Sequence, residues 1–240
     1  MTAIFISDLH LCASRPEILR SFLGFLDGPA READTLCVLG DLFEYWIGDD
    51  DLGDPFNASV ASAFASCAQA GTEILLTHGN RDFLLGEKFA QAANVRLISD
   101  PHLMTLDGTA TLLMHGDTLC TDDRDYQRFR EEIRAPAWRE RFLFKPLTER
   151  KSEVEALRRK SETEKKKKTQ ELMDVNSSAV AIALRAHGYP RLIHGHTHRP
   201  ARHEHLVDGK SCERWVLGDW YDSGSYLRCD ERGLKSIKLS

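Results

Sequence analysis

The chain has 240 residues, of which 42% are hydrophobic and 29% are charged, so it is long enough to bury a continuous core. Its formal net charge of −5 gives no general reason to expect a nucleic-acid partner. This composition excludes a chain disordered throughout, and no stretch approaches the ~20 uninterrupted apolar residues of a membrane-spanning helix.

The N-terminal segment and the cysteines indicate a cytoplasmic protein. The first residues, MTAIFISDLH, have no basic leader and reach Asp8 after a few apolar positions, which is unlike a secretory signal. The cysteines lie at positions 12, 37, 67, 120, 212 and 229 without C-x-x-C spacing, and several stand in apolar runs. They are typical of small buried side chains in a reducing compartment.

Short apolar runs recur along the chain, and each ends in a polar or turn-forming residue. In chain order they are AIFIS, TLCVLG, EILLTHG, ATLLMHG and RLIHG, followed by Asp8, Asp41, Asn80, Asp117 and His196. Each has the length of a buried strand. The segments RPEILRSFLGFLDG and NASVASAFASCAQAG have helical spacing, and Gly71 is placed to end the second one. This alternation predicts a parallel sheet with helices on its faces.

The last third of the chain predicts short strands joined at DG and RG turns. We therefore expect an α/β fold in which two packed sheets form a sandwich flanked by helices, as one domain over residues 1–240. Residues 120–175 interrupt this pattern, because they are rich in Arg, Lys and Glu with interleaved aromatic residues. They predict a helical insertion.

Side chains that can bind metal follow the predicted strands. They are Asp8, His10, Asp41, Asn80, His115, His196 and His198. The carboxyl ends of strands in an open α/β sheet converge on one crevice, so these residues can meet there. Seven oxygen and nitrogen donors are too many for one ion and suit two, and a carboxylate such as Asp41 can bridge them. Donors without thiolate favour Mn²⁺, with Fe²⁺, Co²⁺ or Zn²⁺ as alternatives.

The blocks DLH, GDLFE, GNRD, HGD and GHTH, taken in order from Asp8 to His198, resemble the signature of the calcineurin-like metallophosphoesterases. The resemblance implies a dinuclear centre between two sheets. It also implies one ion held by Asp8, His10, Asp41 and His198, and a second held by Asp41, Asn80, His115 and His196.

A dinuclear centre needs no serine or cysteine nucleophile, because two ions about 3.5–4 Å apart can turn a shared water into one. We therefore expect metal-bound water to attack, with Asn80 and Arg81 as catalytic residues. Many members of the family have His at the position of Arg81, where it resembles a general acid. Arginine keeps its proton, so Arg81 favours a leaving group that is already a weak base, as in a pyrophosphate. The alternative is that Arg81 only pairs with Asp82.

Longer blocks, among them GDLFEYWIGDD, IHGHTHRP and VLGDWYDSGS, resemble the branch of this family that acts in lipid A biosynthesis. This resemblance implies manganese-dependent hydrolysis of UDP-2,3-diacylglucosamine to UMP and 2,3-diacylglucosamine 1-phosphate, or lipid X, with attack on the phosphorus nearer uridine. It also implies substrate contacts from Asn80, Arg81, Asp123, Ser161, Lys168 and His196. Lys165, in the run EKKKK, either replaces an amide contact by a charged one or belongs to a solvated face.

Apolar residues at helical spacing mark the insertion. They are Tyr126, Phe129 and Ile133, then Val154 and Leu157, with Trp138, Phe142, Phe144 and Leu147 adding apolar area. Apolar area beside cations suits a diacylated sugar nucleotide, so we expect a lid over the acyl chains. The alternative is the internal packing of an ordinary helical hairpin.

The cationic and aromatic insertion also suits an anionic membrane surface. We therefore expect peripheral attachment to the cytoplasmic face of the inner membrane of a Gram-negative bacterium, with a soluble charged helix as the alternative. Two other functions remain open. One is a dinuclear phosphoesterase that acts on a soluble nucleotide or a phosphoprotein, and the other is a metal-stabilised binding module without catalysis.

Overall fold

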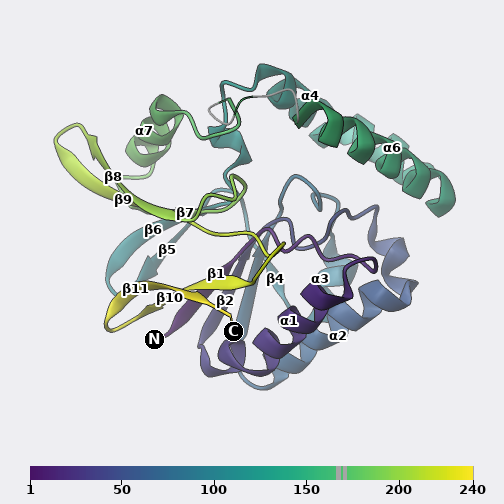
Figure 1. Cartoon of the computed structure of the whole chain (residues 1–240), viewed down its shortest axis with the longest axis horizontal. Coiled ribbons are helices and arrows are strands. Elements are labelled where there is room, and N and C mark those ends of the chain that lie inside the picture. The colour runs from purple at the N-terminus through teal and green to yellow at the C-terminus, as the bar shows by residue number, and fades with distance from the viewer. Residues whose placement is uncertain (166–168, 170–171, 240) are drawn as a thin grey trace.

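A computed structural model describes residues 1–165, 169 and 172–239, except for the side chains at positions 160, 162, 164 and 165. Over these residues the strands form two sheets that pack face to face, with helices on both outer faces (Figure 1). The predicted α/β fold with two sheets flanked by helices is therefore confirmed.

The first sheet has the strand order β11-β10-β1-β2-β3-β4. Strands β1 to β4 are parallel, whereas β10 runs antiparallel to β1 and to β11. The bounds are β1 (Ala3–Ile6), β2 (Thr35–Leu39), β3 (Glu73–Thr77), β4 (Arg96–Leu97), β10 (Ser225–Asp230) and β11 (Gly233–Lys238).

The second sheet has the order β5-β6-β7-β9-β8. Strands β6, β7 and β9 are parallel, and β5 and β8 lie antiparallel at its edges. The bounds are β5 (His102–Leu106), β6 (Thr109–Met114), β7 (Arg191–His194), β8 (Ala201–Val207) and β9 (Lys210–Val216).

The helices cover the sheets and form the insertion. The first sheet is covered by α1 (Pro16–Asp27), α2 (Pro55–Gln69) and α3 (Glu87–Ala93), and the second by α7 (Ser177–Ala186). Short 3₁₀ helices lie at η1 (Pro29–Glu32), η2 (Asp49–Gly53) and η3 (Asp117–Leu119). The insertion contains α4 (Arg124–Arg134), α5 (Pro136–Phe144) and α6 (Leu147–Lys165).

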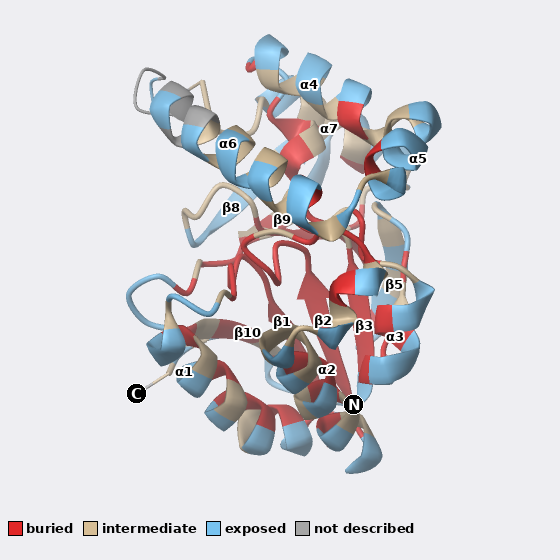
Figure 2. Ribbon diagram, turned by 90° about the vertical axis from the view of Figure 1, so that its right-hand side faces the viewer, coloured by how far each residue is buried: buried red, intermediate tan, exposed pale blue. Residues whose placement is uncertain are grey.

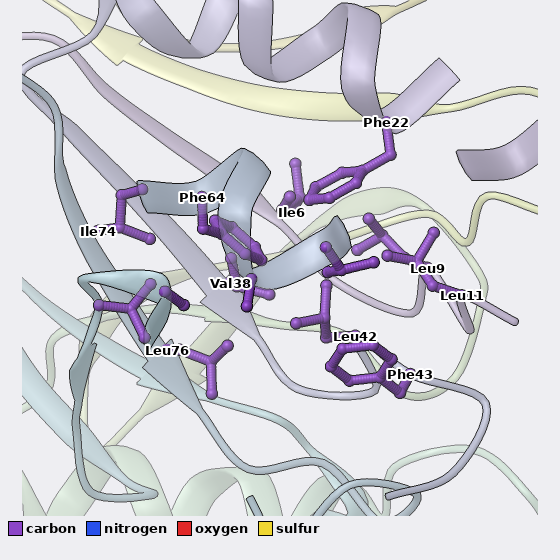
Figure 3. Close-up of a cluster of buried hydrophobic side chains, with 14 of the residues drawn as sticks. Ile6, Leu9, Leu11, Phe22, Val38, Leu42, Phe43, Phe64, Ile74 and Leu76 are labelled. Atoms are coloured by element: carbon purple, nitrogen blue, oxygen red, sulfur yellow. The ribbon is translucent and has the colours of Figure 1, made fainter. Parts of the chain in front are cut away.

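Alternation along the central strands explains the layers. In β1, Ile4 and Ile6 face the helices, whereas Ala3 and Phe5 face the second sheet. Both sets are buried, which is why these strands are continuous apolar runs in the sequence. Figure 3 shows Phe22 of α1 and Phe64 of α2 beside the strand residue Ile6, and the two rings lie 5.2 Å apart. This packing fixes the strands whose carboxyl ends carry the predicted metal donors.

The insertion lies as a largely exposed helical layer at one end of the sheets (Figure 2). Asp123 caps α4 by accepting a hydrogen bond from the backbone N–H of Tyr126 at 3.1 Å. None of the described helices is long and apolar enough to cross a bilayer. The cysteines are free thiols, and all of them except Cys12 are buried, as predicted.

Candidate active site

The predicted metal donors meet beyond the carboxyl ends of β1, β2, β3, β6 and β7. Nε2 of His198 lies 3.3 Å from Oδ1 of Asp8 and 3.4 Å from Nε2 of His10. Among the described residues, the ligand atoms of Asp8, His10 and His198 all lie within 4.8 Å of one another. Those of Asp8, Asp41 and His115 do so too. Residues nearly 190 positions apart therefore form one cluster.

Asp41 lies between the two sides of this cluster. Its Oδ2 is 3.8 Å from Nε2 of His10, and its Oδ1 is 3.8 Å from Nε2 of His115. The same nitrogen of His115 lies 3.0 Å from Oδ1 of Asn80, and the His196 ring is 5.0 Å from the His115 ring. The two oxygens of Asp41 thus face different donors, as a bridging carboxylate requires.

The backbone is strained where the donors lie. Asp8, His10, Asp41, His196 and His198 all have positive φ angles, between 50° and 67°. Such a conformation costs a residue other than glycine about 1–3 kcal/mol and persists only where its surroundings impose it. Here the N–H groups of Asp8 and His10 donate to the carbonyl groups of Gly40 and Asp41. The loops are therefore held in conformations that turn the donors toward each other.

Two glycines allow these loops to approach closely. A Cβ atom on Gly79 would collide with the carboxylate of Asp41, and one on Gly195 would collide with Ser7 and Asp8. Both glycines belong to the quoted blocks GNRD and GHTH. Only glycine fits at these two positions, because the donor cluster leaves no room for a Cβ atom there.

The donor set fits a divalent cation. One oxygen of Asp8, Oδ2, accepts hydrogen bonds from Ser7 Oγ and from the backbone N–H of His196. The other, Oδ1, is buried and has no hydrogen-bond partner among the described residues, although it faces His198. A buried carboxylate oxygen surrounded by imidazole nitrogens and further carboxylates is a site for a hard or borderline metal ion.

The metal-free cluster binds protons strongly. Burial raises the pKa of Asp41 to about 7, and the charges of Asp82 and Asp8 act in the same direction. Burial opposes the charge of His115, yet Asp41, Asp8 and Asp117 raise its pKa to about 9. The pKa of His198 is also raised to about 9, against burial, by hydrogen bonds to Asp219 and Asp8. A cation that binds here must displace these protons.

A cavity of about 430 Å³ opens beside the donor cluster. Asn80 and Arg81 lie on its wall at the metal side, and α4, α5 and α6 form the opposite wall. The insertion contributes mainly apolar side chains to the lining, from Tyr126, Phe129, Ile133, Trp138, Phe142, Val154 and Leu157. Arg130, Arg134 and Arg158 add positive charge. The cavity thus combines apolar area with cations.

The predicted substrate contacts are only partly gathered at this cavity. Asn80, Arg81 and Ser161 line it, and the His196 ring lies 5.9 Å from the ring of Tyr126, another lining residue. Asp123 is the cap of α4 and is not among the lining residues. Lys168 and the side chain of Lys165 lie outside the described residues.

Two apolar residues that were predicted to enlarge the chamber lie elsewhere. Phe144 is 93% exposed at the end of α5, and Leu147 packs against the main core. Neither belongs to the lining. Phe144 is the last residue of α5, where the chain turns away toward α6, so its ring faces solvent.

The alternative pairing of Arg81 with Asp82 is not what the structure shows. Asp82 is fully buried and accepts hydrogen bonds from the backbone N–H groups of Asp41, Leu42 and Gly79. Nη1 of Arg81 lies instead 3.7 Å from Oε1 of Glu44. Asp82 therefore fixes the backbone around the donors and leaves the guanidinium group at the cavity wall.

Sequence reasoning missed Glu44 and Asp117. Glu44, the last residue of GDLFE, is 3% exposed at its side chain and pairs with Arg15, Arg81 and Arg158. Asp117, the last residue of HGD, accepts hydrogen bonds from Tyr126 Oη at 2.8 Å and Arg130 Nε at 2.6 Å. Their place in the quoted blocks was the available signal. Glu44 gathers cations at the cavity, and Asp117 connects the donor loop to α4.

Comparisons with known proteins agree with this geometry. A family model described as calcineurin-like phosphoesterase matches residues 1–200. A UDP-2,3-diacylglucosamine hydrolase of Aromatoleum aromaticum is 57% identical over 233 residues, which cover 97% of this chain and 95% of that protein. The protein of the same name from Chromohalobacter salexigens is 49% identical, covering 92% and 89%. That of Aeromonas salmonicida is 48% identical, covering 95% and 90%.

Proposed function

This chain belongs to the calcineurin-like phosphoesterase family, and we propose that it hydrolyses UDP-2,3-diacylglucosamine to UMP and 2,3-diacylglucosamine 1-phosphate. The observation that carries the proposal is that Asn80 and Arg81 lie where the donor cluster meets the apolar cavity. Asn80 belongs to the donor cluster, Arg81 follows it, and both line an apolar cavity that also contains arginines. A substrate with a diphosphate and two acyl chains requires both features next to each other.

We propose that the cluster holds two divalent ions, most favourably Mn²⁺. Asp8, His10, Asp41 and His198 would hold one ion, and Asp41, Asn80, His115 and His196 the other. This assignment is supported by Asp41, whose Oδ2 faces His10 and whose Oδ1 faces His115. When bound, two such ions supply the Lewis acidity that activates water and neutralises charge on phosphoryl oxygens.

Arg81 and Asn80 would orient the diphosphate. Arg81 offers a planar fork of N–H donors to phosphate oxygens, while Glu44 holds the guanidinium group at the cavity wall. No proton donor is needed for the departing group, because the oxygen that leaves is that of a phosphate monoester. We further propose substrate contacts from Asp123, Ser161, Lys165, Lys168 and His196.

The acyl chains would lie in the cavity under the insertion, so that residues 120–175 act as a lid. The cavity's volume of about 430 Å³ is of the size that binds small molecules and parts of lipids. The apolar stripes of α4 and α6 both face it, through Phe129 and Ile133 on α4 and through Val154 and Leu157 on α6. This arrangement favours a binding chamber over the packed interior of a helical hairpin.

We also propose that the protein attaches to the inner membrane of a Gram-negative bacterium from its cytoplasmic side. Phe144 is 93% and Leu143 40% exposed at the end of α5, and Arg139 and Arg141 on the same helix are exposed. Apolar side chains among cations suit an anionic lipid surface, where each cation contributes about 1 kcal/mol. The lipid substrate would reach the cavity from that surface.

The experiment is hydrolysis in ¹⁸O water. Purified protein with Mn²⁺ is given UDP-2,3-diacylglucosamine, and both products are weighed by mass spectrometry. We expect one ¹⁸O in UMP and none in the lipid product. A dinucleoside polyphosphate serves as the comparison substrate, and the protein should hydrolyse it at least about tenfold more slowly, because it cannot fill the apolar cavity. Equal rates would favour a phosphoesterase of soluble nucleotides, and no turnover of the lipid substrate would refute the proposal.

A further inference from the structure

The segment between β9 and β10 lies against the metal donors without supplying one of them. The N–H of Trp220 donates to the carbonyl group of Asp8 at 3.3 Å, and its ring is buried beside Phe25. The Tyr221 ring stacks on His10, with 5.2 Å between centroids and 5° between planes. The core therefore fixes this segment at the side of the cluster formed by Asp8, His10 and His198.

Asp219 in this segment contacts a predicted metal donor directly. Its Oδ2 lies 3.1 Å from Nδ1 of His198, and its Oδ1 accepts a hydrogen bond from the backbone N–H of Tyr221 at 3.1 Å. The carboxylate is thus oriented by its own turn. Its second oxygen is directed at one particular nitrogen of the imidazole.

The two nitrogens of His198 have different surroundings. Nδ1 faces Asp219, whereas Nε2 faces Oδ1 of Asp8 and Nε2 of His10, inside the donor cluster. A neutral imidazole has one N–H group and one lone pair. An acceptor at Nδ1 keeps the N–H group there, so the lone pair lies on Nε2 and points into the cluster.

We propose that Asp219 is a positioning residue, which holds the His198 ring in the orientation and tautomer that present Nε2 to a divalent metal ion. The inference rests on the proposed dinuclear function, and it assigns Asp219 no contact with the metal or the substrate. Asp219 acts through His198 alone. Loss of the Asp219 carboxylate should therefore weaken the binding of the ion held by Asp8, His10 and His198. The affinity for the ion near His115 should stay the same.

The test measures Mn²⁺ binding to the metal-free full-length chain, with free Mn²⁺ followed by electron paramagnetic resonance. The parent should bind two ions. In Asp219→Ala, the Kd of one ion should rise about 10- to 100-fold while the other stays within twofold. The isosteric Asp219→Asn keeps an acceptor oxygen and should show a smaller rise. Asp222→Asn removes an exposed carboxylate three residues away and is the matched control, with parental binding.

A second background tests whether Asp219 works through His198. In His198→Ala, the additional change Asp219→Ala should alter neither Kd. An equal loss in that background would overturn the inference, and so would two parental Kd values in Asp219→Ala. Failure of the parent to bind Mn²⁺ would overturn the proposed dinuclear function as well. If the parent binds two ions and Asp219→Ala has the same two Kd values, only the positioning role of Asp219 is refuted.

Discussion

Single residues at the donor cluster couple metal binding to pH. The pKa values of His115 and His198 rise from 6.5 to about 9, and that of Asp41 rises from 3.8 to about 7. A group whose pKa is higher in the folded than in the unfolded state stabilises the fold at pH values below its unfolded-state pKa. This stabilisation is lost as the pH rises through its folded-state pKa. For the two histidines the loss falls between about pH 6.5 and 9, and for Asp41 between about 3.8 and 7.

The metal-free protein should therefore lose stability from pH 6.5 to 9, whereas bound Mn²⁺ replaces the protons and binds more tightly as pH rises. We expect the increase in Tm on adding saturating Mn²⁺ to be several degrees larger at pH 9 than at pH 6.5. Differential scanning calorimetry of the chelated and the loaded protein measures it. The same increase should depend less on pH in His198→Ala, and an increase independent of pH in the parent would contradict the expectation.

The donors could be predicted from sequence because each follows an apolar run and belongs to a short block in a fixed order. Their supporting carboxylates could not. Glu44 gathers arginines from three distant segments, and Asp219 faces a histidine 21 positions before it in the chain. Both residues belong to quoted blocks, GDLFE and VLGDWYDSGS, but nothing in these blocks indicates which side chains the carboxylates face. Their roles depend on neighbours that only the folded chain supplies.

At the scale of elements, the buried strands were predictable from their apolar runs, and the more exposed β8 and β11 were predictable from the DG and RG turns beside them, whereas β4 and β5 were not. β1 and β2 are buried along their whole length, so they read as apolar runs. β5 alternates between half-buried and exposed positions, and β4 has two residues, so neither has a comparable signal. The turn between β8 and β9 was predictable because an Asp-Gly pair favours a hairpin turn with two positive φ angles, and Asp208 and Gly209 both adopt positive φ. The position of Phe144 depended on where α5 ends, which its aromatic composition did not reveal.

Helix α6 is attached to the body through Arg150, which is 1% exposed. Its guanidinium group donates to the carbonyl group of Ile47 and to Asp50, in the loop that precedes and includes η2. The neighbouring Lys151 forms ion pairs with Asp51 and Asp54 from a more exposed position. Although they are adjacent in sequence, the two cations should contribute differently.

Arg150→Met should lower the free energy of unfolding by about 2–3 kcal/mol, because it removes hydrogen bonds of a charged group and leaves a buried carbonyl oxygen without its donor. It should also raise KM for the diacylated substrate, because α6 forms one wall of the cavity. Lys151→Met should cost less than about 1 kcal/mol. Urea unfolding and steady-state kinetics measure both effects. Equal losses in the two variants would show that Arg150 is not the anchor of α6.

The whole molecule brings three features together. The donor cluster lies at the carboxyl ends of the strands, and the insertion forms a helical layer at that end (Figure 2). The cavity is lined both by Asn80 and Arg81 and by residues of the insertion, and Phe144, the last residue of α5, is exposed. In the proposed function, the acyl chains lie against the apolar lining of the insertion while Arg81, on the same cavity, binds the diphosphate. The proposed function thus gives the insertion two roles, as a membrane contact and as a lid.

The proposed membrane attachment should be separable from catalysis. Phe144→Ser should weaken binding to vesicles that contain anionic lipid by about tenfold or more, because burial of a Phe side chain contributes ~1.5–3 kcal/mol. Turnover of substrate in detergent micelles should stay unchanged, since Phe144 does not line the cavity. Ile182→Ser is the matched control, because Ile182 is 63% exposed on α7, which is not part of the insertion. Flotation at low salt measures binding, and an equal loss in both variants would place the membrane contact elsewhere.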